Sequence, residues 1–505
     1  MPKYLLAHDL GTSGNKATLY TTDGDLVKSK VYAYDTHYFN NNWVEQDPED
    51  WWKAVCQSTK EILEDIDKKD VAAVSFSGQM MGCLCVDKNG IPLRKSIIWA
   101  DQRSVKEAND IREKIGDDRF YKTTGHRISP SYSLEKLLWI KNNEPEIYDN
   151  TYKMLNSKDY IIFKLTGEFV TDYSDATGTC ILDINTLKWS DEIISITGID
   201  GDKLPTLRES TYVVGGVTEQ AAEQTGLAAG TPVVCGGGDG VCAAVGSGCV
   251  KEGIAFSYVG SSSWIALTTR KPIYDDQMRT FNWAHIIPGY IAPCGTMQSA
   301  GGSYNWLKNE ICKIEAKEAQ EKGISPYKII DEEIAQSPAG ANGLLYLPYL
   351  LGERSPRWNP NAKGAFIGLK MEHQRKDILR SVLEGVTFNL NVILNVFKQY
   401  VDINEVIVIG GGAKGKVWRQ IMADIYNLSI LTPNYLEEAT SMGAAVTGGV
   451  GVGVFKDFEV INKFIKIDSV EKPIESNSSV YRELAPIFDE CYHSLVNVYE
   501  KLAKF

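Results

Sequence analysis

The sequence predicts an α/β protein built from two similar domains, and three observations support that prediction. The chain has 505 residues, whereas a single domain usually has roughly 100–150. Short β-rich runs alternate with longer helical runs along the chain. One strand–turn–strand pattern occurs twice, about 250 residues apart. We therefore expect domains at 1–248 and 249–505, with no long linker between them.

The first domain begins with this pattern. A strand at 4–7, a glycine-containing turn at 11–14 and an alternating strand at 16–20 together indicate a β-hairpin. Asp47 and Pro48 then provide an N-cap and a first helical residue, so a helix should begin there.

The second domain begins in the same way. It has a strand at 254–259, a Gly/Ser turn at 260–263 and a returning strand at 264–268. This repetition favours a duplicated architecture over two unrelated domains.

Later segments complete the α/β pattern. A short apolar strand at 405–409 leads through glycines 410–412 into a helix at 417–426. The apolar residues in 378–397 recur with a period of 3.6, which predicts a long helix with a buried face. The same spacing at 484–502 predicts a C-terminal helix that docks on the protein.

Composition excludes several classes of protein. Hydrophobic residues make up 43% and charged residues 23%, which is typical of a globular chain rather than a disordered or collagen-like one. Lys and Arg number 53 against 65 Asp and Glu, and the net charge of −12 disfavours nucleic acid and acidic membranes as partners. The apolar run before His8 is too short for a signal peptide, and no membrane-spanning apolar stretch occurs. We expect a cytoplasmic protein.

The cysteines and histidines give no metal site. Ten cysteines occur without a CxxC pair or zinc-type spacing, which suits buried thiols in a reducing compartment. The six histidines are scattered, and His8 lies within the first strand, where a structural role is expected.

Turns rich in Gly and Ser can bind an anion, because successive backbone N–H groups converge and no Cβ blocks the approach. Two such turns occur at matching points of the two copies, so both could contact one polyphosphate. Ordinary hairpin turns are the alternative. Asp9 favours a functional site, since a carboxylate at the end of a buried strand is costly unless it serves a cation or a donor. It could hold Mg²⁺ through water, and Lys16 could neutralise phosphate charge.

The segment 231–248 runs from a strand through three glycines into Asp239 and a helix of small residues. Gly238, Gly240 and Ala243 fit a variant of the dinucleotide-binding fingerprint. Asp239 in that loop would repel a pyrophosphate, however, and no acidic residue follows about 20 positions later to bind the ribose. We therefore interpret Asp239 as an exposed carboxylate on a tight turn, positioned as a general base for a substrate hydroxyl.

Residues 410–417 nearly match a phosphate-binding loop with a strand before it and a helix after it. Val417 lacks the hydroxyl that this motif uses for Mg²⁺. We interpret the glycines as a place where a flat ligand, such as an adenine nucleoside, can approach the backbone. A purely structural strand-to-helix turn is the alternative.

Two longer segments are more specific than any glycine turn. Residues 131–143 and 364–385 match both signature patterns of the FGGY carbohydrate kinases completely, and the resemblance covers nearly the whole chain. Further segments are similar to family segments and occur in the expected order: DLGTSGNKATLY, WVEQDPEDWW, SGQMMG, WADQR, LTGEFVTDYSDATGT and GERSP.

The resemblance implies two domains of the duplicated actin/hexokinase-like (ribonuclease H-like) fold, with the active site in the inter-domain cleft. It also implies ATP and Mg²⁺ as cofactors and a small-molecule sugar as substrate. Asp239 matches the family's catalytic base, and Asp9 its magnesium-linked aspartate. The expected nucleotide-binding residues are Gly11, Thr12, Ser13, Lys16, Gly260, Ser261, Gly411, Gly412 and Ala413. The expected substrate-binding residues are Met80, Met81, Trp99, Ser131, Asp239 and Trp264.

The resemblance favours a pentulose such as D-xylulose, phosphorylated at its terminal primary hydroxyl. SGQM, GGGD and GERSP resemble xylulokinases, yet those enzymes usually have His and Asn where this chain has Met81 and Gly240. The Asp-Gly pair, WADQR and residues 357–359 resemble gluconokinases. Gluconate or another polyol acid is therefore the alternative substrate.

A catalytically silent sugar-binding regulator on the same fold is the alternative from another class. Retention of Asp9, Lys16 and Asp239 argues against it, because a pure binder needs none of them. We expect a homodimer.

Overall fold

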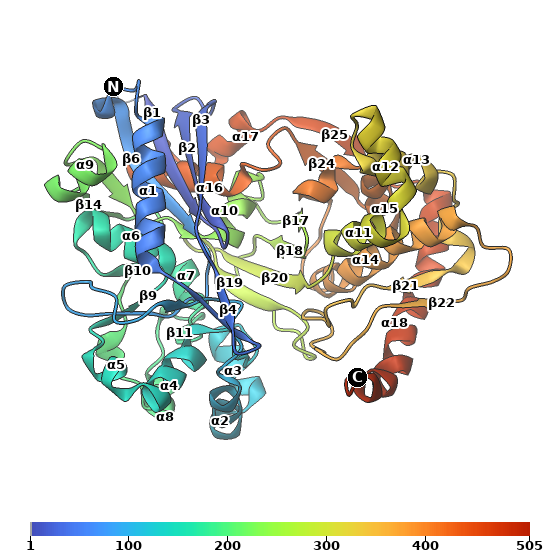
Figure 1. Cartoon of the computed structure of the whole chain (residues 1–505), viewed down its shortest axis with the longest axis horizontal. Helices are drawn as coiled ribbons and strands as arrows, with labels where there is room; N and C mark the ends of the chain where they lie inside the picture. Colours follow the sequence, from blue (N-terminus) through green and yellow to red (C-terminus); the bar gives the residue numbers. More distant parts are fainter. Residues whose placement is uncertain (1–2) are drawn as a thin grey trace.

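The computed structural model describes residues 3–505 and shows two α/β halves side by side, each built around a seven-stranded sheet (Figure 1). The N-terminal sheet has the order β14-β15-β6-β1-β2-β3, with β16 paired to β6. Its strands are β1 (Tyr4–Leu10), β2 (Gly14–Thr21), β3 (Leu26–Ala33), β6 (Val71–Gly78), β14 (Val213–Gly216), β15 (Pro232–Val234) and β16 (Gly237–Gly238). The C-terminal sheet has the order β19-β20-β18-β17-β23-β24-β25. Its strands are β17 (Ile254–Val259), β18 (Ser263–Leu267), β19 (Phe281–Ala284), β20 (Ile291–Met297), β23 (Glu405–Ile409), β24 (Ser429–Pro433) and β25 (Ile467–Glu471).

The two sheets repeat one topology, so the predicted duplication is confirmed. In the N-terminal sheet, β1 pairs antiparallel with β2 and parallel with β6. In the C-terminal sheet, β17 pairs antiparallel with β18 and parallel with β23. The correspondence continues outward, because β3 matches β20 while β15 and β14 match β24 and β25. The Gly/Ser turns at 11–13 and 260–262 therefore lie at equivalent ends of their sheets.

Helices cover both sheets, and short strands fill the loops. The N-terminal half contains α1 (Pro48–Ile62), α2 (Val105–Ile115), α3 (Asp117–Thr124), α4 (Ser133–Asn143), α5 (Pro145–Asn150), α6 (Ser157–Thr166), α7 (Tyr173–Thr177), α8 (Asp191–Thr197), α9 (Glu219–Thr225) and α10 (Asp239–Gly246). The C-terminal half contains α11 (Gly301–Trp306), α12 (Lys313–Lys322), α13 (Pro326–Ile334), α14 (Arg375–Phe397), α15 (Lys416–Tyr426), α16 (Ala439–Gly451), α17 (Ile461–Phe464) and α18 (Glu475–Leu502). The short strands are β4 (His37–Phe39), β5 (Trp43–Gln46), β7 (Leu84–Val86), β8 (Ser96–Ile97), β9 (Lys153–Leu155), β10 (Val170–Asp172), β11 (Leu182–Asp183), β12 (Lys188–Trp189), β13 (Thr206–Arg208), β21 (Leu345–Leu347) and β22 (Ala365–Ile367).

Local sequence signals explain several of these elements. The Asp47 side chain accepts a hydrogen bond from the backbone of Glu49, and Pro48 is the first residue of α1, as predicted. All ten cysteines are free thiols. Among residues 3–505, no helix is both long enough and apolar enough to span a membrane.

His8 is a structural residue, as predicted. Its ring is fully buried and contacts the side chains of Asn15 and Thr59 at 3.2 Å each. Burial lowers the pKa of His8 to about 4, so the ring is neutral at physiological pH.

Helices α10 and α16 pack against each other at the centre of the molecule (Figure 1). The contact needs glycine on both helices. A Cβ on Gly246 would lie 1.7 Å from the carbonyl oxygen of Ala439, and one on Gly443 would lie 1.9 Å from that of Cys242. Helix α16 also packs against β1 and β6, so the second half of the sequence contributes a helix to the first sheet. The domain boundary near residue 248 stays a prediction.

The C-terminal helix α18 docks as predicted, and the predicted face forms part of the docked surface. Phe488 is buried, and Leu484, Cys491 and Leu495 are partly buried against the core. Tyr481, Tyr492 and Tyr499 are buried, whereas Ile487 and Val498 of the expected face are 47% and 43% exposed. The tyrosine rings supply apolar area to the docked face, and the hydroxyls of Tyr481 and Tyr492 also reach polar partners. Aliphatic periodicity does not detect such a face.

Candidate active site

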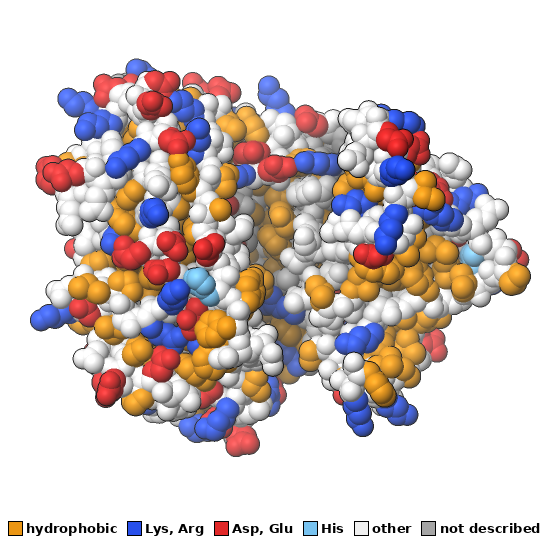
Figure 2. Space-filling model, viewed as in Figure 1, with side chains coloured by type: hydrophobic (Ala, Val, Ile, Leu, Met, Phe, Trp, Pro, Cys, Tyr) orange, Lys and Arg blue, Asp and Glu red, His pale blue; other side chains and the backbone are white. Residues whose placement is uncertain are grey.

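The face shown in Figure 2 is hollowed by a cleft between the two halves. Contacts within the structure bring several of the predicted site residues together. The first Gly/Ser turn, formed by Gly11, Thr12 and Ser13, joins β1 to β2 in the N-terminal half. The indole nitrogen of Trp99 donates a hydrogen bond to Thr12 Oγ1 at 2.9 Å. This bond ties a predicted sugar-contacting ring to the predicted phosphate turn.

Asp9 lies one residue before the end of β1, opposite Lys16 on β2. Its Oδ1 is buried and has no hydrogen-bond partner within residues 3–505, and burial raises the pKa of its carboxyl. The Lys16 ammonium donates to the backbone carbonyl of Glu437, 2.9 Å away in the C-terminal half. The first strand pair thus presents a carboxylate oxygen with unused bonding capacity and a lysine that bonds to the segment before α16.

The carboxylate of Asp9 suits a Mg²⁺ ion that is held mainly by water molecules and phosphate oxygens. Within the described part of the chain, no three His, Cys, Asp or Glu side chains are arranged around a metal position. Mg²⁺ usually binds through one or two carboxylates, several waters and the phosphates of a substrate. The unsatisfied Oδ1 of Asp9 fits that mode of binding.

The three-glycine loop before α10 is tightly enclosed. Gly236 has φ of +68°, and a Cβ there would lie 2.0 Å from the carbonyl oxygen of Phe76. A Cβ on Gly238 would lie 2.4 Å from Met80 Sδ. Only glycine fits at position 236, where backbone atoms block a Cβ, and the close approach of Gly238 brings the start of α10 against the predicted substrate residue Met80.

Asp239 is the first residue of α10, and it is half-buried rather than exposed as expected. The expectation of an exposed turn was wrong because both halves of the molecule enclose the loop. Burial raises the pKa of Asp239 to about 7, with a second contribution from the negative charge of Asp9. A carboxylate with a pKa near 7 can accept a proton at neutral pH.

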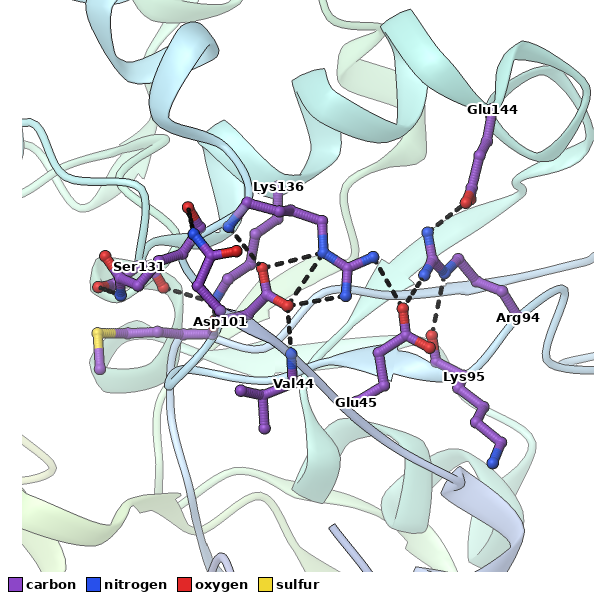
Figure 3. Close-up of polar contacts among 12 residues, drawn as sticks. Val44, Glu45, Arg94, Lys95, Asp101, Ser131, Lys136 and Glu144 are labelled. Carbon is purple, nitrogen blue, oxygen red and sulfur yellow. Dashed lines mark hydrogen bonds and ion pairs between the residues drawn. The ribbon is translucent and has the colours of Figure 1, made fainter. Parts of the chain in front are cut away.

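One buried lysine, Lys136, forms hydrogen bonds with both of the predicted substrate residues Met81 and Ser131. Figure 3 shows Lys136 beside Ser131. The Lys136 ammonium donates to the backbone carbonyls of Met81, at 2.7 Å, and Ser131. Met81 has φ of +63°, and the lysine fixes this left-handed conformation. Gln102 donates to Ser131 Oγ at 2.7 Å. Burial lowers the pKa of Lys136 to about 7.

A buried network of ion pairs supports this wall of the cleft (Figure 3). Arg103 pairs with Asp101 at 2.7 Å and with Glu45 at 2.8 Å. Arg94 also pairs with Glu45, and with Glu144 at 2.5 Å. Each charge has an opposite charge beside it, so the network fixes the segment that carries Trp99 and Gln102 without leaving an isolated buried charge.

Trp264 enters the cleft from β18 of the C-terminal sheet. Its ring stacks on Tyr258, with the centroids 4.2 Å apart, and its buried Nε1 has no hydrogen-bond partner within residues 3–505. Burial raises the pKa of Tyr258, and the charges of Asp9 and Asp239 raise it further. The aromatic pair therefore lies on the side of the C-terminal sheet that faces the two carboxylates.

A pocket of about 840 Å³ opens in the C-terminal half. Gly260 and Ser261 of the second turn, together with Gly411 and Gly412, line it, whereas Ala413 is buried below. Aromatic and polar residues from α11 and α13 form the opposite wall: Tyr304, Asn305, Tyr327, Lys328, Asp331 and Glu332. This pocket can hold a flat aromatic group with its polar substituents beside the second turn.

Comparison with known proteins identifies the family. Residues 4–246 match the N-terminal domain, and residues 255–452 the C-terminal domain, of the FGGY family of carbohydrate kinases. The chain belongs to this family. Both the predicted family and the predicted fold are therefore confirmed.

Relatives of this FGGY kinase include enzymes named for two different sugars. A gluconokinase from Bacillus licheniformis is 33% identical, and the match covers 100% of this chain and 98% of that protein. A xylulose kinase from Staphylococcus xylosus is 34% identical, with coverage of 97% and 99%. Solved structures of a ligand-bound xylulose kinase and a gluconate kinase from Lactobacillus acidophilus each have a TM-score of 0.92 and 28% identity, covering 99% of this chain and 100% and 99% of their own. Sequence identity and structural similarity are therefore nearly equal for the kinases named for xylulose and for gluconate.

Some residues of this FGGY kinase that surround the cleft were not singled out by sequence reasoning. Lys136 lies inside the first signature, but a lysine in a helix is ordinarily read as exposed. Tyr258 belongs to a predicted strand. Because residues two apart in a strand share a face, Phe256 and Tyr258 lie on one side, and this pattern could have placed Tyr258 on the face toward the other domain. Tyr304 and Asp331 carried no sequence signal, because only the packing of α11 on α13 brings them to the pocket.

Proposed function

We propose that this FGGY carbohydrate kinase transfers the γ-phosphoryl group of ATP to the terminal primary hydroxyl of a pentulose, with D-xylulose as the leading substrate. The observation that carries the proposal is Asp239, a half-buried carboxylate with a pKa raised to about 7, beside Asp9 in the cleft. Its position lets it contact a sugar in the N-terminal half while ATP occupies the C-terminal pocket.

Each group then has a defined part in the reaction. The Gly260–Ser261 turn and the 11–13 turn bind phosphate oxygens through backbone N–H groups, with Lys16 adding positive charge. Asp9 would hold Mg²⁺, which supplies charge neutralisation on the phosphates when it is bound. Asp239 accepts the proton of the attacking hydroxyl as the oxygen–phosphorus bond forms. Closure of the cleft excludes water that would otherwise compete with the sugar.

The pocket wall explains why we expect broad specificity. Met80, Met81, Trp99 and Trp264 offer mainly apolar surface, and Ser131 Oγ already accepts a hydrogen bond from Gln102. A site with few polar groups rejects a wrong sugar weakly, because strong discrimination requires buried polar groups that the wrong sugar leaves unpaired. Several related ketoses should therefore react.

Gluconate or another polyol acid is the second candidate. Gluconokinases match the whole chain at 33% and 32% identity, close to the 34% of the xylulose kinase from Staphylococcus xylosus. A non-catalytic regulator is disfavoured because Asp239, with its perturbed pKa, lies beside Asp9.

Adding polar groups at two pocket positions tests the pentulose proposal. The double variant Met81→His and Gly240→Asn should raise the preference for D-xylulose over other ketoses about 30-fold, since each of the two added hydrogen bonds is worth roughly 1 kcal/mol. Gly240 can accept a side chain, because a Cβ there meets no atom within 4 Å and its φ is not positive. Histidine tolerates the positive φ of residue 81 better than a β-branched residue does.

The measurement is kcat/KM for each sugar in a coupled ADP-release assay, with both single variants as controls. An unchanged ranking of ketoses, or a gain for gluconate only, would contradict the assignment of a pentulose to this pocket.

A further inference from the structure

A chain of buried hydrogen bonds leads from the interior of the N-terminal half to the residue that precedes Asp239. Its centre is Asp172, the last residue of β10 and the N-cap of α7. Asp172 Oδ2 accepts hydrogen bonds from Ser174 Oγ at 2.5 Å and from Ser210 Oγ at 2.7 Å. All three side chains are buried.

The side chain of Ser174 continues this chain of hydrogen bonds to the three-glycine loop. Its Oγ donates to Asp172 and accepts a hydrogen bond from the backbone N–H of Gly238 at 2.9 Å. When a hydroxyl donates a hydrogen bond to a carboxylate, its oxygen becomes a better hydrogen-bond acceptor. The two hydrogen bonds of Ser174 therefore reinforce each other. Ser210 Oγ makes the equivalent bond to Asp172 and, within residues 3–505, none to the loop. Ser210 contacts the loop through its backbone carbonyl, which accepts from the Gly236 N–H at 2.9 Å and which alanine would keep.

The other carboxylate oxygen of Asp172 is fixed by a lysine. Lys158 Nζ lies 2.9 Å from Asp172 Oδ1 and 2.6 Å from Asp159 Oδ1, and all of these side chains are buried. A carboxylate held on both oxygens cannot rotate without breaking a buried ion pair, which is strongly unfavourable. The acceptor that orients the Ser174 hydroxyl is therefore rigid.

The loop depends on such support because it has no side chains of its own. Residues 236–238 are three glycines, which lose more conformational entropy on folding than any other residue. A short strand pairing holds Gly237 and Gly238 beside β6. The bond from Gly238 to Ser174 joins a buried side chain to the residue directly before Asp239, the first residue of α10.

We propose that Ser174, fixed by Asp172 and Lys158, is a positioning residue that sets the orientation of the Asp239 carboxylate for proton acceptance. This inference rests on the proposed kinase function. It assigns a role to Ser174, a buried serine that does not itself line the cleft. A misplacement of about 1 Å at a reacting group can lower turnover roughly 10²-fold.

Ser174→Ala and Ser210→Ala form a matched pair that tests the proposal. Each variant removes one buried hydroxyl from Asp172 Oδ2. Ser174→Ala also leaves the Gly238 N–H without its acceptor, so it should be the less stable of the two. We expect Ser174→Ala to lower kcat about 10- to 100-fold with the sugar KM within about threefold of wild type, whereas Ser210→Ala should change kcat less than about threefold. Equal kcat in the two folded variants would overturn the proposal.

Two further measurements keep the test decisive. If Ser174→Ala does not fold, Ser174→Cys preserves the shape with a weaker hydrogen bond, and a wild-type kcat in that variant would overturn the proposal. Amide hydrogen exchange of the 234–240 segment needs no activity. It should rise in the Ser174 variant and stay at the wild-type rate in Ser210→Ala, and equal exchange in both would refute the positioning role. A wild-type protein without sugar-dependent ADP release would count against the proposed function alone.

Discussion

Replacing Asp239 with Asn should lower turnover about 10²- to 10⁴-fold, the range expected for loss of a positioned general base. The amide keeps the shape of the side chain and removes its charge. Phosphoryl transfer depends mainly on positioning and charge stabilisation, so sugar affinity should change much less than kcat. Steady-state kinetics and calorimetric sugar binding measure the two effects separately.

The pH dependence of the wild-type enzyme provides the matching control. Burial raises the pKa of Asp239 to about 7, so in the free enzyme the base is protonated and inactive below that pH. We expect kcat/KM to fall tenfold per pH unit on the acid side of about pH 7, and Asp239→Asn to abolish this dependence. Near-wild-type turnover in the variant, or an unchanged acid limb, would remove Asp239 from the mechanism.

Replacing Gly246 with Ala should destabilise the fold by about 3 kcal/mol or more, the upper end of the cost of overpacking a core. The added Cβ would lie 1.7 Å from the carbonyl oxygen of Ala439, and backbone cannot move aside as a flexible side chain can. The α10–α16 contact must open to accept it. Because Asp239 is the first residue of α10, the same shift should lower kcat.

Gly240→Ala on the same helix is the control, since a Cβ there meets no atom within 4 Å. Alanine has a higher helix propensity than glycine, so this variant should be as stable as wild type or slightly more stable. Chemical denaturation gives the free energy of unfolding of each protein. A Gly246→Ala protein as stable as Gly240→Ala would show that the two helices do not pack as described.

Much of the fold could be predicted because its signals are local. The strands Ile254–Val259 and Glu405–Ile409 were predicted with the bounds that the structure shows, since each is a short apolar run that ends in a glycine turn. The repeated hairpin predicted the duplication, because topology follows from the order of such elements. The buried face of α18 was predicted only in part, because tyrosines form the rest of it.

The site could be predicted only where chemistry and motif coincide. Asp9 and Asp239 follow from the cost of burying carboxylates and from their segments. Lys136 could not be found this way, since its partners are backbone carbonyls that any sequence provides. Ser174 reaches Gly238 across 64 residues of chain, so only the tertiary structure reveals that contact.

The measurement that tests the central claim most directly is ADP release by the wild-type enzyme with MgATP and a panel of sugars. The panel holds D-xylulose, related ketoses, polyols and gluconate, and NMR locates the phosphate on each product. We expect D-xylulose and several other ketoses to react, with the ester at a terminal carbon and little ATP hydrolysis without sugar. An enzyme that phosphorylates gluconate alone and ignores every ketose would contradict the account.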